Sequence, residues 1–227
     1  LLITVQKPTF AHAEIHVNSN DIKQDWYWDK SNSPYILDEP IYIPKGYVLN
    51  IDKGVEVKSA PSEDSPNSIT LDGDLNVYGT KDDPVIFNNL YSIYLSNNKF
   101  NINNVVFDAT GIDINKRQGK INSSTINNAF YAITAKGSNL DISSTTLENN
   151  SYGIVSNISR SIFQADTKGG FGIENIGGEG NAMLGIINPV VDDLQNIIKI
   201  NDSNIMNNLY YGVLNQTVNT IDAKNNW

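Results

Sequence analysis

The chain has 227 residues, of which 18% are charged, and its formal net charge is −9. This acidity, with only two arginines and scattered lysines, argues against a nucleic-acid partner, which would require a basic stripe for the phosphates. There are no cysteines, which excludes disulfides, cysteine-ligated zinc and a thiol nucleophile. Isoleucine and valine recur beside 33 asparagines, and this mixture favours a folded β protein over a disordered chain.

The first thirteen residues, LLITVQKPTFAHA, have the features of the end of an export signal. An apolar start precedes Ala11-His12-Ala13, the small-x-small spacing that signal peptidase recognises. We therefore expect residues 1–13 to be the end of a signal peptide, and the mature protein to be secreted or displayed at the cell surface. The alternative is a frayed N-terminal strand. No apolar run approaches the roughly 20 residues of a membrane helix.

Residues 14–34 are aromatic and polar and show no period. Trp26 and Trp28 are candidates for stacking on a carbohydrate. The interpretation that we favour is an N-terminal cap, because the first unit of a repeat array otherwise exposes its apolar core and unpaired strand edges.

Between residues 35 and 89 the chain alternates short strand-like runs with turn residues. The runs YIL, IYI, YVLNI, VEVK, LNVYG and VIF are each bounded by Pro, Gly or Asp, as is typical of strands separated by tight turns. No stretch of a dozen residues shows a capped 3.6-residue period. The sequence predicts an almost entirely β chain.

From residue 100 onward the chain repeats. Ile121 is followed at +5 by Ile126 and at +7 by Asn128, and the same pattern returns from Ile142. Such a period predicts the stacked turns of a solenoid. The register runs through the leading residues Ile102, Ile121, Ile142, Ile200 and Ile221, the +5 residues Phe107, Ile126, Leu147 and Ile205, and the +7 residues Ala109, Asn128, Asn149 and Asn207.

The asparagines at equivalent turn positions have a structural explanation. When coils stack about 4.8 Å apart, identical amides can hydrogen-bond to one another in ladders along the stack. Asparagine also tolerates the left-handed conformation at sharp turns. We therefore expect the asparagines to belong to the scaffold and not to a ligand site.

Between residues 157 and 196 the repeat loosens and glycines accumulate. The long interval from Ile142 to Ile200 fits two coils plus an excursion, or three coils of uneven length. The Gly172-Ile173 and Gly185-Ile186 pairs favour coils that continue through this segment. The best acidic pair of the chain, Asp192-Asp193, also lies here, although adjacent strand residues point to opposite faces.

Several motifs give the chain a family resemblance. Trp28, Ser33-Pro34-Tyr35 and a Pro-x-Gly turn are followed by GTKDDPVIF, and the sequence ends in IDAKNNW. Residues 26–227 thus resemble the opening coils of bacterial secreted right-handed parallel β-helix proteins of the pectate-lyase-like superfamily. The resemblance implies an all-β, right-handed, single-stranded parallel β-helix, a solenoid with coils of about 20 residues. It assigns residues 35–227 to that helix, truncated at its C-terminus. The matching residues are Trp28, Ser33, Pro34, Tyr35, Pro44, Gly46, Gly54, Gly79, Thr80, Pro84 and Phe87.

Enzymes of this superfamily work in a groove on the outer face, so the resemblance implies where catalytic residues would lie. The Gly-His-Gly and Arg-x-Lys segments of polygalacturonases are absent, and neither Arg117 nor Arg160 has an acidic cluster nearby in sequence, as a pectate lyase would need. Asp72-Gly73-Asp74 falls short of the six or more oxygen ligands of a Ca²⁺ loop. We assign no catalytic residue, no metal ligand and no cofactor, with Ca²⁺ kept only as a weak candidate.

The leading hypothesis is a monomeric, non-catalytic scaffold, secreted or at the cell surface, that binds a glycan or mediates adhesion. One alternative is a polysaccharide lyase or glycoside hydrolase whose catalytic coils lie beyond this chain or assemble from dispersed Asp and Tyr residues. A weaker one is a periplasmic accessory protein for copper-enzyme maturation, which two histidines and two methionines disfavour. The candidate ligand-binding residues are Trp26, Trp28, Asp192, Asp193, Tyr210 and Tyr211.

Overall fold

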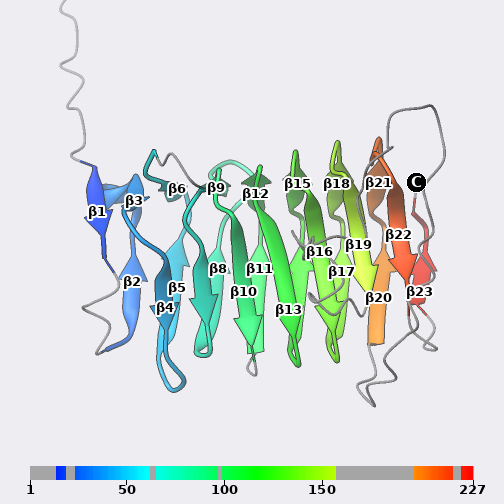
Figure 1. The fold of residues 1–227 in the computed structure, drawn as a ribbon, viewed down its shortest axis with the longest axis horizontal. Helices are drawn as coiled ribbons and strands as arrows, with labels where there is room; N and C mark the ends of the chain where they lie inside the picture. The colour runs from blue at the N-terminus through cyan, green and yellow to red at the C-terminus, as the bar shows by residue number, and fades with distance from the viewer. Residues whose placement is uncertain are drawn as a thin grey trace, which may run out of the picture.

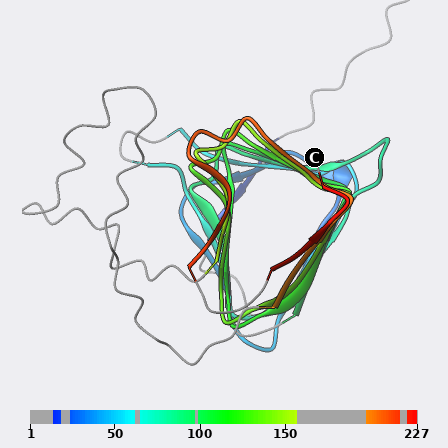
Figure 2. The same ribbon diagram turned by 90° about the vertical axis from the view of Figure 1, so that its right-hand side faces the viewer.

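The computed structural model describes residues 14–18, 24–61, 65–96, 99–156, 197–216 and 221–226. These form a parallel β-solenoid of about seven turns, with about 22 residues per turn. The strands lie side by side along the long axis (Figure 1). Viewed along that axis, they form three flat walls around a roughly triangular interior (Figure 2). One short 3-10 turn, η2 (Lys30–Asn32), interrupts the strands in the described ranges.

Each turn contributes one strand to each of three parallel sheets, which we call A, B and C. A turn passes from sheet B to sheet A, then to sheet C, and returns to sheet B. Sheet A is formed, in spatial order, by β1 (Ile15–Val17), β3 (Tyr35–Leu37), β6 (Glu56–Ser59), β9 (Val85–Asn88), β12 (Val105–Asp108), β15 (Thr125–Asn127), β18 (Thr146–Glu148) and β21 (Asn204–Met206).

Sheet B begins at the same N-terminal end, and most of its strands are longer than those of sheet A. It is formed by β2 (Trp26–Trp28), β5 (Val48–Asp52), β8 (Asp74–Tyr78), β11 (Lys99–Asn103), β14 (Gln118–Asn122), β17 (Asn139–Ser143), β20 (Ile197–Asn201) and β23 (Ile221–Lys224). Sheet C is formed by β4 (Ile41–Ile43), β7 (Ile69–Leu71), β10 (Ser92–Ser96), β13 (Gly111–Asn115), β16 (Tyr131–Lys136), β19 (Tyr152–Ser156) and β22 (Tyr211–Asn215).

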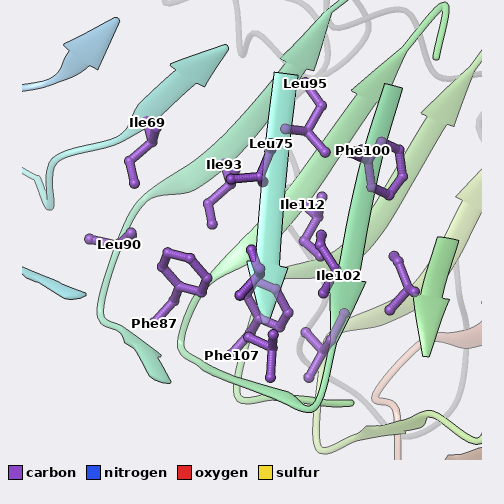
Figure 3. Close-up of a cluster of buried hydrophobic side chains, with 14 of the residues drawn as sticks. Ile69, Leu75, Phe87, Leu90, Ile93, Leu95, Phe100, Ile102, Phe107 and Ile112 are labelled. Atoms are coloured by element: carbon purple, nitrogen blue, oxygen red, sulfur yellow. The ribbon is translucent and has the colours of Figure 1, made fainter. Parts of the chain in front are cut away.

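The interior consists of columns of similar apolar residues, because alternate residues of every strand face inward. Figure 3 shows part of this core, in which the rings of Phe87 and Phe107 stack with centroids 5.2 Å apart. Full burial of each such side chain contributes about 1.5–3 kcal/mol. The most uniform column lies in sheet C, where consecutive pairings join Ile41, Ile69, Ile93, Ile112, Ile133, Ile154 and Val213.

The predicted register is confirmed over most of the repeat. Ile102, Ile121, Ile142 and Ile200 pair in succession in sheet B. The +5 residues pair in the same way from Phe107 to Ile205 in sheet A. The prediction is wrong at Ile221, which pairs with Ile198, while Ala223 pairs with Ile200. The reason is that this turn is slightly longer than the spacing on which the register was based.

The prediction that coils continue through residues 157–196 is also wrong. Strand β17 pairs directly with β20, and β19 pairs directly with β22. No strand therefore intervenes between these two turns, and the long interval from Ile142 to Ile200 is a single turn of the stack. Along the chain, residues 157–196 follow β19 of sheet C and precede β20 of sheet B. That segment, with Asp192 and Asp193, lies outside the described residues.

The corners adopt the predicted left-handed conformation. Asn128, Asn149 and Asn207 have φ between 53° and 58°, and Ala109, which breaks the asparagine rule, has φ 47° at the equivalent position. A second set of corners, from sheet B to sheet A, is left-handed in the same way at Ser123. Short polar residues serve there because their side chains tolerate positive φ better than bulkier ones.

Amide ladders form at only a few of the described positions. Asn76 donates to the side-chain oxygen of Asn50 at 3.1 Å, and Asn122 to that of Asn103 at 2.9 Å. At the buried corners, side chains instead bond to backbone groups of a neighbouring turn. Asn150, for example, accepts from the backbone N–H of Ala129 at 2.9 Å and donates to the carbonyl of Ile126 at 3.0 Å. Corner peptides leave the sheet ladders, so their buried N–H and C=O groups require other partners.

Candidate binding groove

The outer face of sheet B carries a groove of about 650 Å³. Side chains from five consecutive strands, β8, β11, β14, β17 and β20, line it. Inward residues on these strands, such as Val77, Ile102 and Ile142, are fully buried. Because residues of a strand alternate between the faces of a sheet, burial of this apolar set directs the intervening polar side chains outward.

A row of outward residues, which we call the central column, runs along the groove. Register pairing places Asn76, Asn101, Lys120, Asp141 and Lys199 next to one another on successive strands. Neighbouring strands lie about 4.8 Å apart, so the column presents one polar group per turn at a regular interval.

A second row, the flanking column, lies beside the first. Lys99, Gln118 and Asn139 pair in succession on β11, β14 and β17. Asp74 stands one residue before Leu75, and Lys99 one residue before its partner Phe100, so Asp74 belongs to the same column. The groove thus contains three lysines, two aspartates and a series of amides.

Most polar side chains of the groove are available to a ligand, although Asn76 donates to Asn50. Among the described residues, no hydrogen bond engages the side chains of Asn101, Gln118 or Asn139, and no ion pair involves Lys99, Lys120 or Lys199. Surface amides and ammonium groups without protein partners are hydrated, and a ligand that supplies equivalent hydrogen bonds can replace that water.

Two exposed tyrosines lie on the N-terminal part of the same face. Tyr27 is 61% exposed and pairs in register with Asn50, which in turn pairs with Asn76, so the central column continues to Tyr27. Tyr78, at the end of β8, is 48% exposed. Partial desolvation and the neighbouring Asp52 carboxylate raise the pKa of Tyr27. An open aromatic ring with a polar hydroxyl can pack on the apolar face of a sugar.

The tryptophans predicted as ligand candidates face the interior. Trp28 is 4% exposed and stacks on Tyr35 with centroids 4.9 Å apart. Trp26 is half-buried and packs against the core, and its ring centroid lies 5.9 Å from that of Trp28. Between them, Tyr27 points outward, a consequence of strand alternation that the sequence Trp-Tyr-Trp already contained.

Tyr210 lies at the corner between sheets A and C, and Tyr211 begins β22 of sheet C, so both lie away from the groove. Their ring centroids are 4.9 and 6.2 Å from that of Tyr152, which in turn stacks on Tyr131 at 4.9 Å. Burial raises the pKa of Tyr131 and of Tyr152. Rings stacked on one another cover each other's faces, so this tyrosine stack joins adjacent turns and offers little open ring surface.

Arg117, the one arginine among the described residues, has a structural position. It is 2% exposed, and its guanidinium donates to the carbonyls of Leu71, Gly73, Ser96 and Lys99. Burial lowers its pKa to about 10. The side chain therefore ties together three successive turns.

Metal-ligating residues do not gather on the described part of the chain. No group of three or more His, Asp or Glu side chains there could hold a metal ion. No helix in the same residues has the length and apolar character to cross a membrane. Comparison found no matching family model, curated protein or solved structure.

Proposed function

We propose that this protein is an exported, pectate-lyase-like β-helix scaffold that binds an extended glycan along the outer face of sheet B. The observation that carries the proposal is the groove, because it places amides and lysines without partners among the described residues on four successive turns, from β11 to β20. Amide, ammonium and tyrosine groups are the partners that sugar hydroxyls and sugar faces require. The signal-like N-terminal residues and the family resemblance support export and a polysaccharide ligand.

The regular spacing of the groove favours a polymeric ligand over a small molecule. Each turn repeats the same outward positions about 4.8 Å further along the axis, a distance similar to the length of one sugar residue in an extended chain. A linear glycan lying parallel to the axis would meet an equivalent position at every residue. Weak contacts of this kind add up along the polymer, and their sum gives a polar groove its affinity.

Glycan-array screening followed by calorimetry tests this function. We expect binding to at least one linear polysaccharide, and weaker binding when Gln118 and Asn139 are both replaced by alanine. The matched control replaces Asn88 and Thr146, which point outward from sheet A, by alanine. Equal loss in the groove variant and in the control, or no binding to any glycan, would contradict the proposal.

The rival function is a polysaccharide lyase or glycoside hydrolase. Assays for reducing ends and for unsaturated uronates, with and without Ca²⁺, measure it directly. Turnover of any polysaccharide that the protein binds would replace the scaffold function by an enzymatic one.

A further inference from the structure

The charges of the groove alternate in sign along the solenoid axis. In the central column Lys120, Asp141 and Lys199 stand on three successive strands, in register at each step. In the flanking column Asp74 and Lys99 occupy equivalent positions on β8 and β11. A ligand that lies along the groove therefore meets both signs of charge within a few turns.

These charges do not neutralise one another. Opposite charges facing each other across strands can stabilise a sheet by pairing. The ion pairs between described residues instead include Lys30–Asp83 at 2.7 Å and Lys224–Asp222 at 3.4 Å, both outside the groove. No nitrogen–oxygen distance of 4.0 Å or less joins Lys120 or Lys199 to Asp141. The two lysines and the aspartate thus remain available to a ligand.

A polymer with one kind of charge fits this groove poorly. A polyanion would contact Lys120 and Lys199 but would bring negative charge against Asp141 and Asp74. A polycation would be attracted by the two aspartates of the groove and repelled by its three lysines. Like charges brought together in this way lower affinity and act as a specificity device against the wrong partner.

We propose that the groove recognises a zwitterionic glycan, one that carries both ammonium groups and carboxylate or phosphate groups along a linear chain. In this assignment, which rests on the proposed glycan-binding function, Lys120 and Lys199 bind the anionic groups and Asp141 binds the ammonium group between them. The amides of Asn101 and Gln118 bind hydroxyls of the intervening sugars.

Four polymers with the same β-1,4-linked backbone test the charge requirement. They are hydroxyethyl cellulose (neutral), carboxymethyl cellulose (anionic), chitosan (cationic) and O-carboxymethyl chitosan (zwitterionic), compared at a pH at which the amines are protonated. We expect O-carboxymethyl chitosan to bind most tightly. We expect its affinity to fall as salt is raised, because exposed charges are screened.

The variant Asp141→Asn separates zwitterion recognition from simple attraction of anions. It should weaken binding of the zwitterionic polymer about two- to fivefold and strengthen binding of the anionic one, because it removes a partly exposed charge that attracts ammonium and repels carboxylate. Lys120→Gln should weaken both. Thermal unfolding of each variant checks that the stack is intact.

The outcomes separate the two levels of the proposal. Tighter binding of the zwitterion by Asp141→Asn, or a preference of the wild-type protein for the neutral, cationic or anionic polymer, would overturn zwitterion recognition and leave glycan binding standing. Absence of binding to all four polymers and to the glycan array would overturn both.

Discussion

The ring of Phe100 occupies the space that a side chain at Gly119 would fill. The two residues pair in register on β11 and β14, and a Cβ at Gly119 would overlap the Cε1, Cδ1 and Cζ atoms of that ring. Here the absence of a side chain serves packing, because it leaves room for a large aromatic residue beneath the groove.

Replacing Gly119 by alanine should therefore destabilise the protein. Overpacking of a filled core costs about 1–3 kcal/mol, although alanine in an open strand position would be at least as favourable as glycine. Urea unfolding of Gly119→Ala, Phe100→Leu and the double variant forms a double-mutant cycle. The double variant should lose less stability than the two single losses combined, and strict additivity would show that the ring and residue 119 do not interact.

The adjacent asparagines Asn149 and Asn150 should differ in how their replacement by glycine changes the stability of the protein. Asn149 has φ 57°, so Asn149→Ala should cost about 1 kcal/mol and Asn149→Gly should be nearly neutral. Asn150 is 1% exposed and bonds to the backbone of the preceding turn. Without the Asn150 side chain, a buried N–H and a buried C=O are left unpaired. Both Asn150→Ala and Asn150→Gly should therefore lower the free energy of unfolding by at least about 2 kcal/mol.

Chemical denaturation of the four variants distinguishes a conformational role from a hydrogen-bonding one. Rescue of stability by glycine at position 150, or its failure at position 149, would contradict the roles assigned here. Circular dichroism of each folded variant confirms that the β-solenoid persists before stabilities are compared.

The tyrosine stack predicts a loss of stability at alkaline pH. Burial raises the pKa of Tyr131 in the folded protein, whereas in the unfolded chain it titrates near 10. Above that pH the unfolded state releases the phenol proton and the folded state keeps it. The free energy of unfolding should therefore fall as pH rises, by at most about 1.4 kcal/mol per pH unit for this group.

Urea unfolding between pH 8 and 11 measures this effect by comparing the wild-type protein with Tyr131→Phe. The variant should show the flatter pH dependence, because phenylalanine has no proton to lose. Tyr78→Phe, at an exposed tyrosine, is the control and should leave the wild-type slope in place. An unchanged slope in Tyr131→Phe would assign the alkaline loss to other groups.

The period of the sequence was sufficient to predict the solenoid and most of its register. Apolar residues at Ile102, Ile121 and Ile142 recur at nearly equal intervals, and only stacked coils bury all of them. The register was wrong at Ile221 because a corner can lengthen without any change in the strands. A spacing that is counted along the chain cannot show in which corner the additional residues lie.

The groove was not predicted, although its charged residues are sequence neighbours of the isoleucines that define the repeat. Lys120, Asp141 and Lys199 each directly precede one of the leading isoleucines, so outward positions could have been read from the same alignment. The interval from Asp141 to Lys199 is far longer than that from Lys120 to Asp141, and it concealed their adjacency until β17 and β20 were seen to pair. Trp26 and Trp28 were kept as ligand candidates instead, because the sequence does not show on which face of a strand the alternation begins.

The direct pairing of β17 with β20 shows that the register of the strands does not depend on the length of the chain between them. Strands fix which residues meet: β17, β18 and β19 pair with β20, β21 and β22, although residues 157–196 stand between the two sets in the chain, where it passes from sheet C to sheet B. The entropy of closing a loop grows only slowly with its length, so such a corner tolerates long additions. This corner is therefore the natural place to introduce a foreign peptide or a reporter domain while the three walls of the stack stay in register.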